Sequence, residues 1–188
     1  MYNPFPFDDP KPVNCPALSK ETIESIVTGG TPNVAKKFVA QLAERIKSEG
    51  VIVGIDGYTT ANWNLFVNLL ARECVIHGFE FEVLDSLKAV LKPGKEIDDM
   101  IDPLLIWDTK IDPTLLFGKL YHGGYIGLFD GAKVAEFKAA VPSRKAPGRL
   151  TVVAGYGSMI AELRDMYDVK CWFDITPMKT MLRIRGGE

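Results

Sequence analysis

A run of apolar residues that changes abruptly into a helical pattern constrains this chain more than any other feature. Residues 51–66 read VIVGIDGYTTANWNLF. An apolar, largely β-branched run that is broken by glycines is typical of a strand buried on both faces of a parallel sheet. Helical spacing then begins at Leu65, Phe66, Leu69 and Leu70. We therefore expect a buried strand, a loop that starts at Gly57 and a helix over about 63–76.

A strand, a loop and a helix in this order form a phosphate-binding loop when they carry G-x-x-x-x-G-K-[ST]. The backbone N–H groups of such a loop hold phosphates, its lysine reaches the β- and γ-phosphates, and its hydroxyl binds Mg²⁺. Aligned on Gly57, this chain has Asn62 for the second glycine, Trp63 for the lysine and Asn64 for the hydroxyl residue. Removing a cation about 4 Å from a transferring phosphate costs roughly 4 kcal/mol at an effective dielectric constant near 20, or about a thousandfold in rate.

The loop keeps some capacity for an anion, because a helix N-terminus attracts negative charge even without a lysine. We expect weak binding of phosphate, a nucleotide or Mg²⁺ at most, and no dedicated metal site. The candidate phosphate- or nucleotide-binding residues of the loop are Gly57, Tyr58, Thr59, Thr60, Ala61, Asn62, Trp63 and Asn64. Trp63 also favours the alternative of a filled, purely structural loop, because a large aromatic side chain occupies space where phosphate would lie.

Composition excludes several classes of function. A chain of 188 residues with 47% hydrophobic content can bury the core of one α/β domain. Its net charge of −2 and isoelectric point near 5.8 do not supply the basic surface that nucleic acid or an anionic membrane requires. Its three cysteines lack a C-x-x-C pair and are expected to be reduced. Without a basic, apolar leader or a long apolar run, the chain is expected to be cytoplasmic.

Residues 1–16 are expected to form an extended arm. Prolines stand at positions 4, 6, 10, 12 and 16, which excludes a helix. The aromatic residues between them are Tyr2, Phe5 and Phe7. We expect these aromatics to hold the arm on the domain's own surface. The alternative, a Pro-rich peptide ligand for another protein, is disfavoured because no basic residue flanks a P-x-x-P motif here.

Two helices are predicted between the arm and the central strand. Ser19 is a favourable N-cap for a short helix to about Val27. Thr31-Pro32 begins a second, amphipathic helix with proline at its first position, which ends just before the central strand. Residues 1–49 are therefore expected to be an arm plus two helices packed on a domain that is formed by residues 50–188.

The remaining chain alternates predicted strands and helices. Strands are expected over 79–85, 150–155 and 169–175, and helices over about 96–100, 130–138 and 159–164 and from Pro177 onward. Strands separated by helices favour a parallel sheet with right-handed crossovers. The expected fold class is a three-layer α/β domain.

Asp85 is the candidate catalytic residue, because it ends the second predicted strand. Ligands of open α/β sheets bind beyond the carboxyl ends of the strands. A strand-end aspartate is equally suited to capping the next helix, and the sequence favours neither role. The aspartates between positions 98 and 112 lack the spacing of a Ca²⁺ loop and are expected to form turns and caps.

Four stretches carry a family resemblance: GIDG at 54–57, LD at 84–85, VVAGY at 152–156 and LRDMYDVKCWFD at 163–174. With them the chain resembles the uridine-kinase-like branch of the P-loop kinases. The resemblance implies a P-loop kinase-like sheet, here without its last strand, and places Arg183 and Arg185 at the family's arginine-bearing lid. It also implies a metal-organising carboxylate after the third strand, where this chain has Ala154. Together with the three changes in the loop, this argues against phosphoryl transfer.

A second resemblance covers the C-terminal half, in DPTLLFGKL at 112–120, LFD at 128–130, AGYGS at 154–158, DITP at 174–177 and RIRGG at 183–187. These stretches are similar to the kinase-like N-terminal domain that is fused to class I mannose-6-phosphate isomerases. The resemblance implies a role in carbohydrate metabolism and a C-terminal phosphomannose isomerase domain after Glu188 in the same polypeptide. The isomerase zinc site would not lie here, because the chain has only His77 and His122.

Three functions follow from these patterns, and we expect the first. It is a non-catalytic, kinase-like domain that regulates, senses a small phosphorylated ligand or docks beside a sugar-phosphate enzyme. The second is an active nucleoside or sugar kinase with a rearranged site, in which Asp85 is the base, Asp56 binds metal, and Arg183 or Arg185 binds phosphate. The third is a purely structural assembly module.

Overall fold

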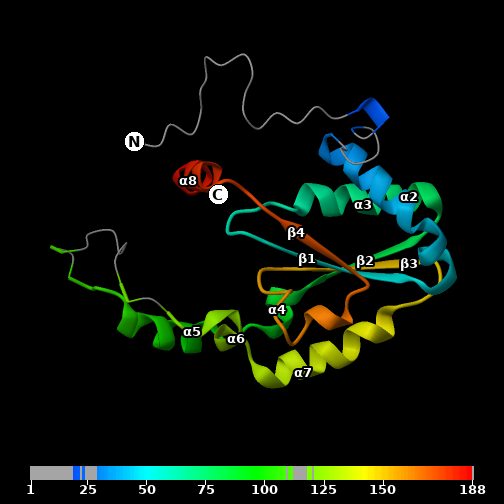
Figure 1. Cartoon of the computed structure of the whole chain (residues 1–188). Coiled ribbons are helices and arrows are strands. Elements are labelled where there is room, and N and C mark those ends of the chain that lie inside the picture. Colours follow the sequence, from blue (N-terminus) through cyan, green and yellow to red (C-terminus); the bar gives the residue numbers. More distant parts are fainter. Residues whose placement is uncertain are drawn as a thin grey trace, which may run out of the picture.

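Four parallel strands form the centre of the structure, a computed structural model in which residues 19–21, 23, 29–108, 110–111, 118–119 and 121–187 are described. Within these residues the strands are β1 (Val51–Gly57), β2 (Glu80–Asp85), β3 (Arg149–Ala154) and β4 (Val169–Phe173). Their order across the sheet is β2-β3-β1-β4, and every pairing is parallel (Figure 1). The predicted α/β class with a parallel sheet is confirmed.

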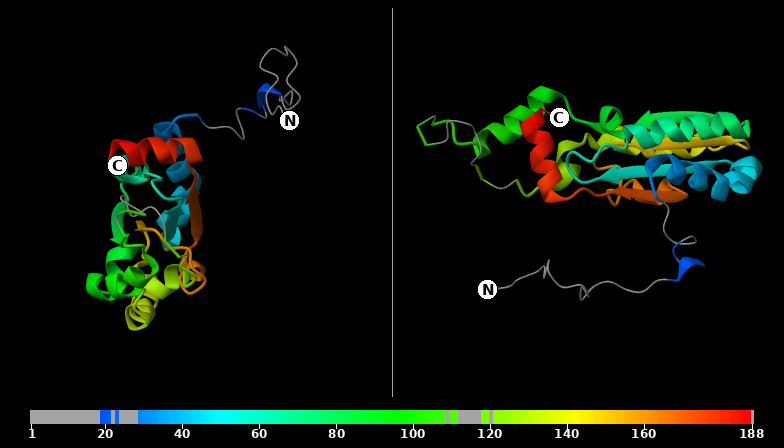
Figure 2. Two further views of the ribbon diagram at one scale, coloured as in Figure 1. Left: turned by 90° about the vertical axis from the view of Figure 1, so that its left-hand side faces the viewer. Right: turned by 90° about the horizontal axis from the view of Figure 1, so that it is seen from above.

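Helices cover both faces of the sheet and give three layers (Figures 1 and 2). One face carries α2 (Thr31–Glu49) and α3 (Asn64–His77), and the other carries α4 (Ser86–Val90) and α7 (Gly131–Ala140). Successive strand residues point to opposite faces. Val53 and Ile55 therefore join the core under α2 and α3, whereas Ile52 packs with Val141 and Tyr167. All seven residues of β1 are buried, as the apolar run predicts.

The helices on the first face begin and end where the local sequence predicts. Pro32 lies in the first turn of α2, and Gly50 ends that helix with φ of 77°. Gly78 ends α3 in the left-handed conformation. Ala35, Val39 and Ile46 of α2 are fully buried. The predicted helix after Ser19 and the predicted arm lie largely or wholly outside the described residues.

The second half contains more short helices than the sequence indicates. The helix expected over 96–100 is α5 (Gly94–Ile101), and Asp130 caps α7 by accepting from the N–H groups of Ala132 and Lys133. Helix α4 and helix α6 (Gly124–Leu128) are additional, as are short 3₁₀ helices at Asp102–Leu104 and Val141–Arg144. Five-residue elements of this kind carry too little periodicity to be predicted.

The prediction of a helix over 159–164 was wrong. Turns occupy 156–163, followed by a 3₁₀ helix at Arg164–Met166. Gly157 has φ of 81°, and the N–H groups of Gly157 and Met159 donate to the carboxylate of Asp56. These bonds anchor the segment to β1 as a turn, and the left-handed backbone at Gly157 is incompatible with a right-handed helix at that residue.

An ion-pair network ties α2 to the start of the sheet. Asp168 accepts from Arg45 at 2.5 Å and from Lys145 at 2.9 Å, and its other oxygen accepts from the backbone N–H of Ile52 at 2.8 Å. Burial acts to raise the pKa of Asp168, but the bond from Ile52 and the charges of Lys145 and Arg45 outweigh it and lower the pKa. The network therefore stabilises the end of the sheet opposite to the loop after β1.

Helix α8 (Pro177–Gly186) follows β4 and lies beyond the carboxyl ends of the strands (Figure 1). Thr176 caps it by accepting from the N–H of Lys179. Among the described helices, none combines the length and the apolar character needed to cross a membrane.

Candidate functional site

The loop from β1 to α3 has the position of a phosphate-binding loop, but its glycine is needed for the close packing of β1 against β4. A Cβ atom on Gly57 would lie 2.4 Å from the carbonyl oxygen of Phe173, far inside contact distance. The N–H of Tyr58 donates to this same carbonyl at 2.9 Å. Glycine is therefore required at position 57 by the close approach of two strands, independently of any ligand.

Four of the eight backbone N–H groups between positions 57 and 64 are bonded within the protein. Gly57 donates to the carboxylate of Asp56 at 2.8 Å, and Ala61 donates to the carbonyl of Tyr58 at 2.8 Å. Asn64 donates to the side chain of Asn62 at 2.9 Å, which forms an Asx turn at the start of α3. With the bond from Tyr58 to β4, four N–H groups between positions 57 and 64 have acceptors. A phosphate would have to displace these bonds to be held as in a phosphate-binding loop.

Trp63, at the position of the lysine, belongs to an aromatic cluster. Its ring lies edge-on to Tyr156, with centroids 4.9 Å apart, and to Phe173, with centroids 6.4 Å apart. Phe173 in turn contacts Phe66 of α3 at 5.4 Å. The hydroxyl of Tyr156 donates to the carbonyl of Ala61 at 3.4 Å, which joins the cluster to the loop. The side chain that replaces the lysine is thus part of the packing between the loop and β4.

Asp56 is buried and fully engaged by backbone groups. One oxygen accepts from Gly57 and from Gly157 at 3.2 Å, and the other accepts from Met159 at 3.0 Å. Burial, followed by the nearby charge of Asp56, raises the pKa of Tyr167, whose hydroxyl donates to the carbonyl of Ser158. The arrangement gives Asp56 a structural role, which is to position the turn after β3.

Asp85 lies at the carboxyl end of β2, where it caps α4. It accepts from the N–H of Lys88 at 3.0 Å, and its second oxygen lies 3.6 Å from the ammonium group of the same residue. Strand β3 separates β2 from β1, so Asp85 and the loop do not follow neighbouring strands. Ala154 pairs with Asp85 in the register of β2 and β3. Of the two roles that the sequence left open for Asp85, the observed contacts are those of a cap.

Helix α8 covers the loop. Arg183 donates a hydrogen bond to the carbonyl of Thr60, a residue with φ of 67°. Arg185 is exposed near the end of the helix. Three cavities lie here: one of about 480 Å³ lined by Tyr58 and residues 174–177, one of about 270 Å³ lined by Asn62, Lys179 and Arg183 among others, and one of about 260 Å³ lined by residues 60–64 and Tyr156. The last two are smaller than the roughly 300–1,000 Å³ typical of small-molecule sites, whereas the first falls within that range.

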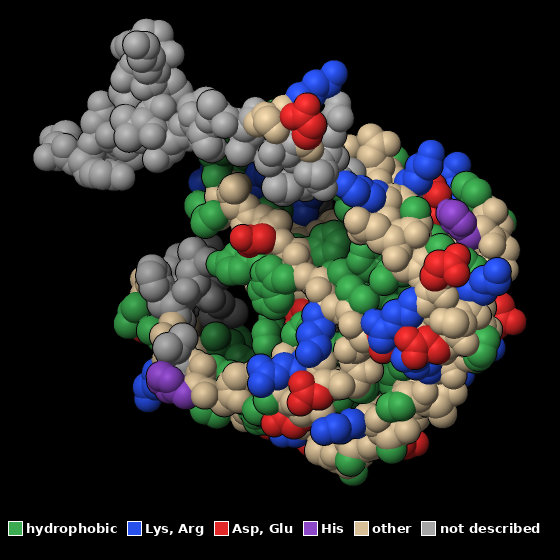
Figure 3. Space-filling model, turned by 45° about the vertical axis from the view of Figure 1, so that its right-hand side comes forward, with side chains coloured by type: hydrophobic (Ala, Val, Ile, Leu, Met, Phe, Trp, Pro, Cys, Tyr) green, Lys and Arg blue, Asp and Glu red, His purple; other side chains and the backbone are tan. Residues whose placement is uncertain are grey.

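The described residues contain no group of three or more His, Cys, Asp or Glu side chains that could hold a metal ion. His77 stacks on Phe79 with ring centroids 5.7 Å apart, and His122 is exposed. On the face shown in Figure 3, basic side chains lie among acidic ones, and hydrophobic side chains gather near the middle.

Two solved structures match the chain, both at 14% identity. The crystal structure of a candidate fructose transport system kinase from Silicibacter sp. TM1040 matches with a TM-score of 0.51 over 86% of this chain and 84% of that chain. A candidate uridine kinase from Bacillus stearothermophilus matches with a TM-score of 0.44 over 79% of this chain and 84% of that chain. At this identity the first match shows the fold alone, and that fold is P-loop kinase-like.

No curated protein matches the sequence. One family model does, and it is described as a domain of unknown function, DUF8485. It covers residues 38–188, which include the whole sheet, the loop after β1 and α8. The chain therefore belongs to the DUF8485 family.

Proposed function

We propose that this chain is a non-catalytic, P-loop kinase-like domain whose nucleotide site is filled by its own residues. One observation carries the proposal: Trp63 stands in place of the phosphate lysine and is packed against Tyr156 and Phe173. A lysine at this position would contribute charge to a transferring phosphate, whereas an indole contributes none. The internal bonds of the loop N–H groups and of Asp56 support the same conclusion.

Nucleotide turnover tests this proposal. The full chain is incubated with Mg²⁺ and ATP, GTP or UTP, alone and with uridine, fructose 6-phosphate or mannose 6-phosphate, and released phosphate and phosphorylated product are measured. The expected result is turnover no faster than the buffer blank. Turnover that disappears in Asp85→Asn would overturn the proposal and support the kinase with a rearranged site. Asp99→Asn, an exposed change on α5, is the matched control for that substitution.

A second candidate function, sensing of a small phosphorylated ligand, is favoured by one observation. Lys179 and Arg183 line the same 270 Å³ cavity beside the loop. Two cations at a small cavity suit a phosphate group, although Arg183 would have to share its bond to Thr60. Calorimetry with phosphate and mannose 6-phosphate tests this candidate. Binding that weakens in Lys179→Ala would support it, and the absence of heat at millimolar ligand would eliminate it.

For the physiological role we propose docking to a mannose-6-phosphate isomerase-type enzyme, including a C-terminal isomerase domain of the same polypeptide. The sequence resemblance to the isomerase-linked domain supports this partner. The large hydrophobic side chains that α8 leaves more than half exposed support a docking surface on it, and they are Met178, Met181, Leu182 and Ile184.

Binding to the purified isomerase of the source organism tests the docking role. The full chain is expected to bind, and Leu182→Glu on α8 is expected to abolish binding. Val75→Glu, at an apolar position on α3 that is 77% exposed against 58% for Leu182, is the matched control and is expected to bind normally. Equal binding by both variants, or none by the unchanged chain, would contradict the assignment.

A further inference from the structure

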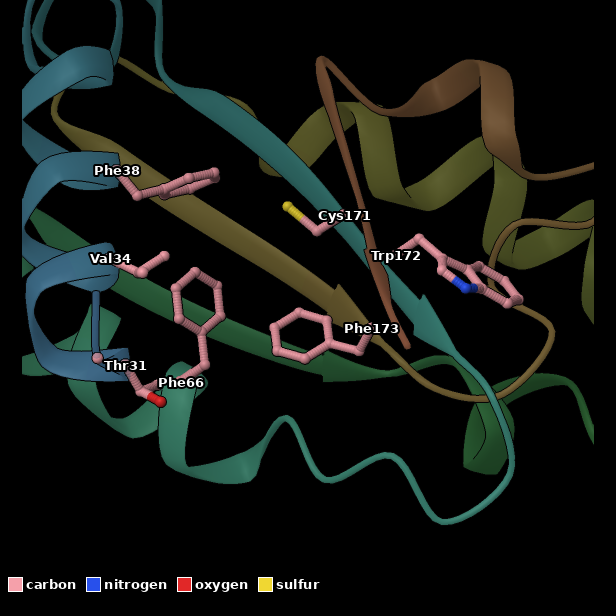
Figure 4. A pocket seen from close by; sticks show the side chains of 8 residues that line it. Thr31, Val34, Phe38, Phe66, Cys171, Trp172 and Phe173 are labelled. Carbon is pink, nitrogen blue, oxygen red and sulfur yellow. The ribbon is translucent and has the colours of Figure 1, made fainter. Parts of the chain in front are cut away.

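An apolar groove lies between α2, α3 and β4, and it shares Phe66 and Phe173 with the aromatic cluster beside the loop. Its volume is about 540 Å³. In Figure 4, Val34 and Phe38 of α2 and Phe66 of α3 point toward Cys171 and Phe173 of β4. The floor and walls are therefore mostly aromatic and aliphatic.

One wall of the groove is a sheet edge. Strand β4 is the outermost strand among the described residues, so the outer side of its backbone has no strand partner there. Trp172 also lines the groove and is 62% exposed, and its ring points away from the side chains of Cys171 and Phe173 (Figure 4). The groove is thus open along β4 and closed by α2 and α3.

We propose that the Pro-rich arm, residues 1–18 of this same chain, occupies this groove. The first argument is position. Gly30, the N-cap of α2, and Thr31, its first residue, line the groove, so the segment that follows the arm joins the first long helix at the groove itself. Docking at the point of entry needs no long connection, and a tethered segment acts at a high effective concentration.

The second argument is chemical match. Aromatic-lined grooves bind Pro-rich segments because a polyproline II helix is already extended and loses little entropy on binding. The arm has five prolines in its first 16 residues, with Tyr2, Phe5 and Phe7 between them. The groove supplies Phe38, Phe66 and Phe173. The aromatic side chains of the arm would pack against the apolar side chains of this groove.

Protection of a reporter thiol in the full chain tests this proposal. Val34 lines the groove and is 37% exposed in the described structure, so Val34→Cys places a reactive thiol at the proposed contact. If the arm occupies the groove nine-tenths of the time, alkylation of this thiol is slowed about tenfold. Adding Phe5→Asp and Phe7→Asp is expected to restore the faster rate.

Val75→Cys is the matched control, because it lies on α3 and is 77% exposed. Its alkylation rate is expected to be the same with and without the two arm substitutions. If the Val34→Cys thiol were alkylated at the same rate with the unchanged arm and with the Asp-substituted arm, the proposal would be overturned. Protection that grows with protein concentration would overturn it as well, because a second copy would then supply the arm. A synthetic peptide of residues 1–18, added to the Asp-substituted chain, is expected to restore protection.

Discussion

Trp63 lies edge-on to Tyr156, with ring centroids 4.9 Å apart and an interplanar angle of 67°, at the position where a phosphate-binding loop has its lysine. This contact joins the loop after β1 to the turn after β3. Both segments lie at the carboxyl end of the sheet, where ligands of open α/β folds bind. The packing of Trp63 thus lies at the end of a P-loop kinase-like fold where ligands would bind, and the proposed non-catalytic role rests on it.

We predict that Trp63→Ala lowers the free energy of unfolding by about 3 kcal/mol, the lower end of the range for removing a packed tryptophan. We use the lower end because Trp63 is partly exposed, so its removal takes less apolar surface out of the core. Urea denaturation measures the change. Trp172→Ala, at a position that is 62% exposed, is the control and is expected to cost less than about 0.5 kcal/mol. Equal effects would contradict the packing role of Trp63.

Asp56→Ala is predicted to be more damaging than Asp85→Ala. The first substitution leaves three backbone N–H groups without their acceptor in a buried site, at about 1–3 kcal/mol for each unsatisfied group. The second removes only an exposed helix cap, worth about 0.5–2 kcal/mol. Chemical denaturation of both variants compares them. If Asp85→Ala costs more, the structural role assigned to Asp56 is wrong.

Gly57→Ala is expected to destabilise the protein by about 1–3 kcal/mol, because the added Cβ would collide with the backbone of β4. Gly131→Ala in the first turn of α7 is the matched control, since its Cβ would meet no atom within 4 Å. This control is expected to be neutral or slightly stabilising. Thermal melts of the two variants distinguish them, and equal melting temperatures would show that β4 does not require the glycine.

Acid sensitivity is predicted to depend on Asp168. Its pKa is lower in the folded protein than in the unfolded chain, so its contribution to stability is complete above the unfolded value of 3.8 and disappears as the pH falls through the folded pKa. Asp168→Asn should therefore be less stable than the unchanged chain at pH 7 and should lose less stability between pH 5 and about pH 3. If the free energy of unfolding fell equally with pH in Asp168→Asn and in the unchanged chain, the stabilising role assigned to Asp168 would be wrong.

The strands and the long helices could be predicted because their signals are local. A β-branched apolar run interrupted by glycine identifies β1, and Pro32 with Gly50 limits α2 at both ends. The strand-loop-helix order at Gly57 is likewise contained in adjacent residues. These features require no knowledge of what packs against them.

Trp63 indicated from the sequence that the loop could be filled, but the residues that pack and bond there could not be predicted, because they lie far apart in sequence. Asp56 bonds Gly157, 101 residues away, and Arg183 bonds Thr60, 123 residues away. The bonds to Asp56 anchor the turn after β3, and the local periodicity, which suggested a helix there, carries no information about them. Asp85 could be placed at a strand end, but only the structure shows that it bonds Lys88.

The most direct test of the central claim is a thermal-shift panel on the full chain with Mg²⁺ and ATP, GTP, UTP, uridine or phosphate. A ligand at a hundred times its dissociation constant would add about 2.7 kcal/mol of stability, which is a shift of several degrees. We predict no shift with any nucleotide, because Trp63 and the internally bonded loop occupy the phosphate position. A shift with a nucleotide that disappears when Thr60 is replaced by tryptophan would contradict this account and show that the loop still binds nucleotide.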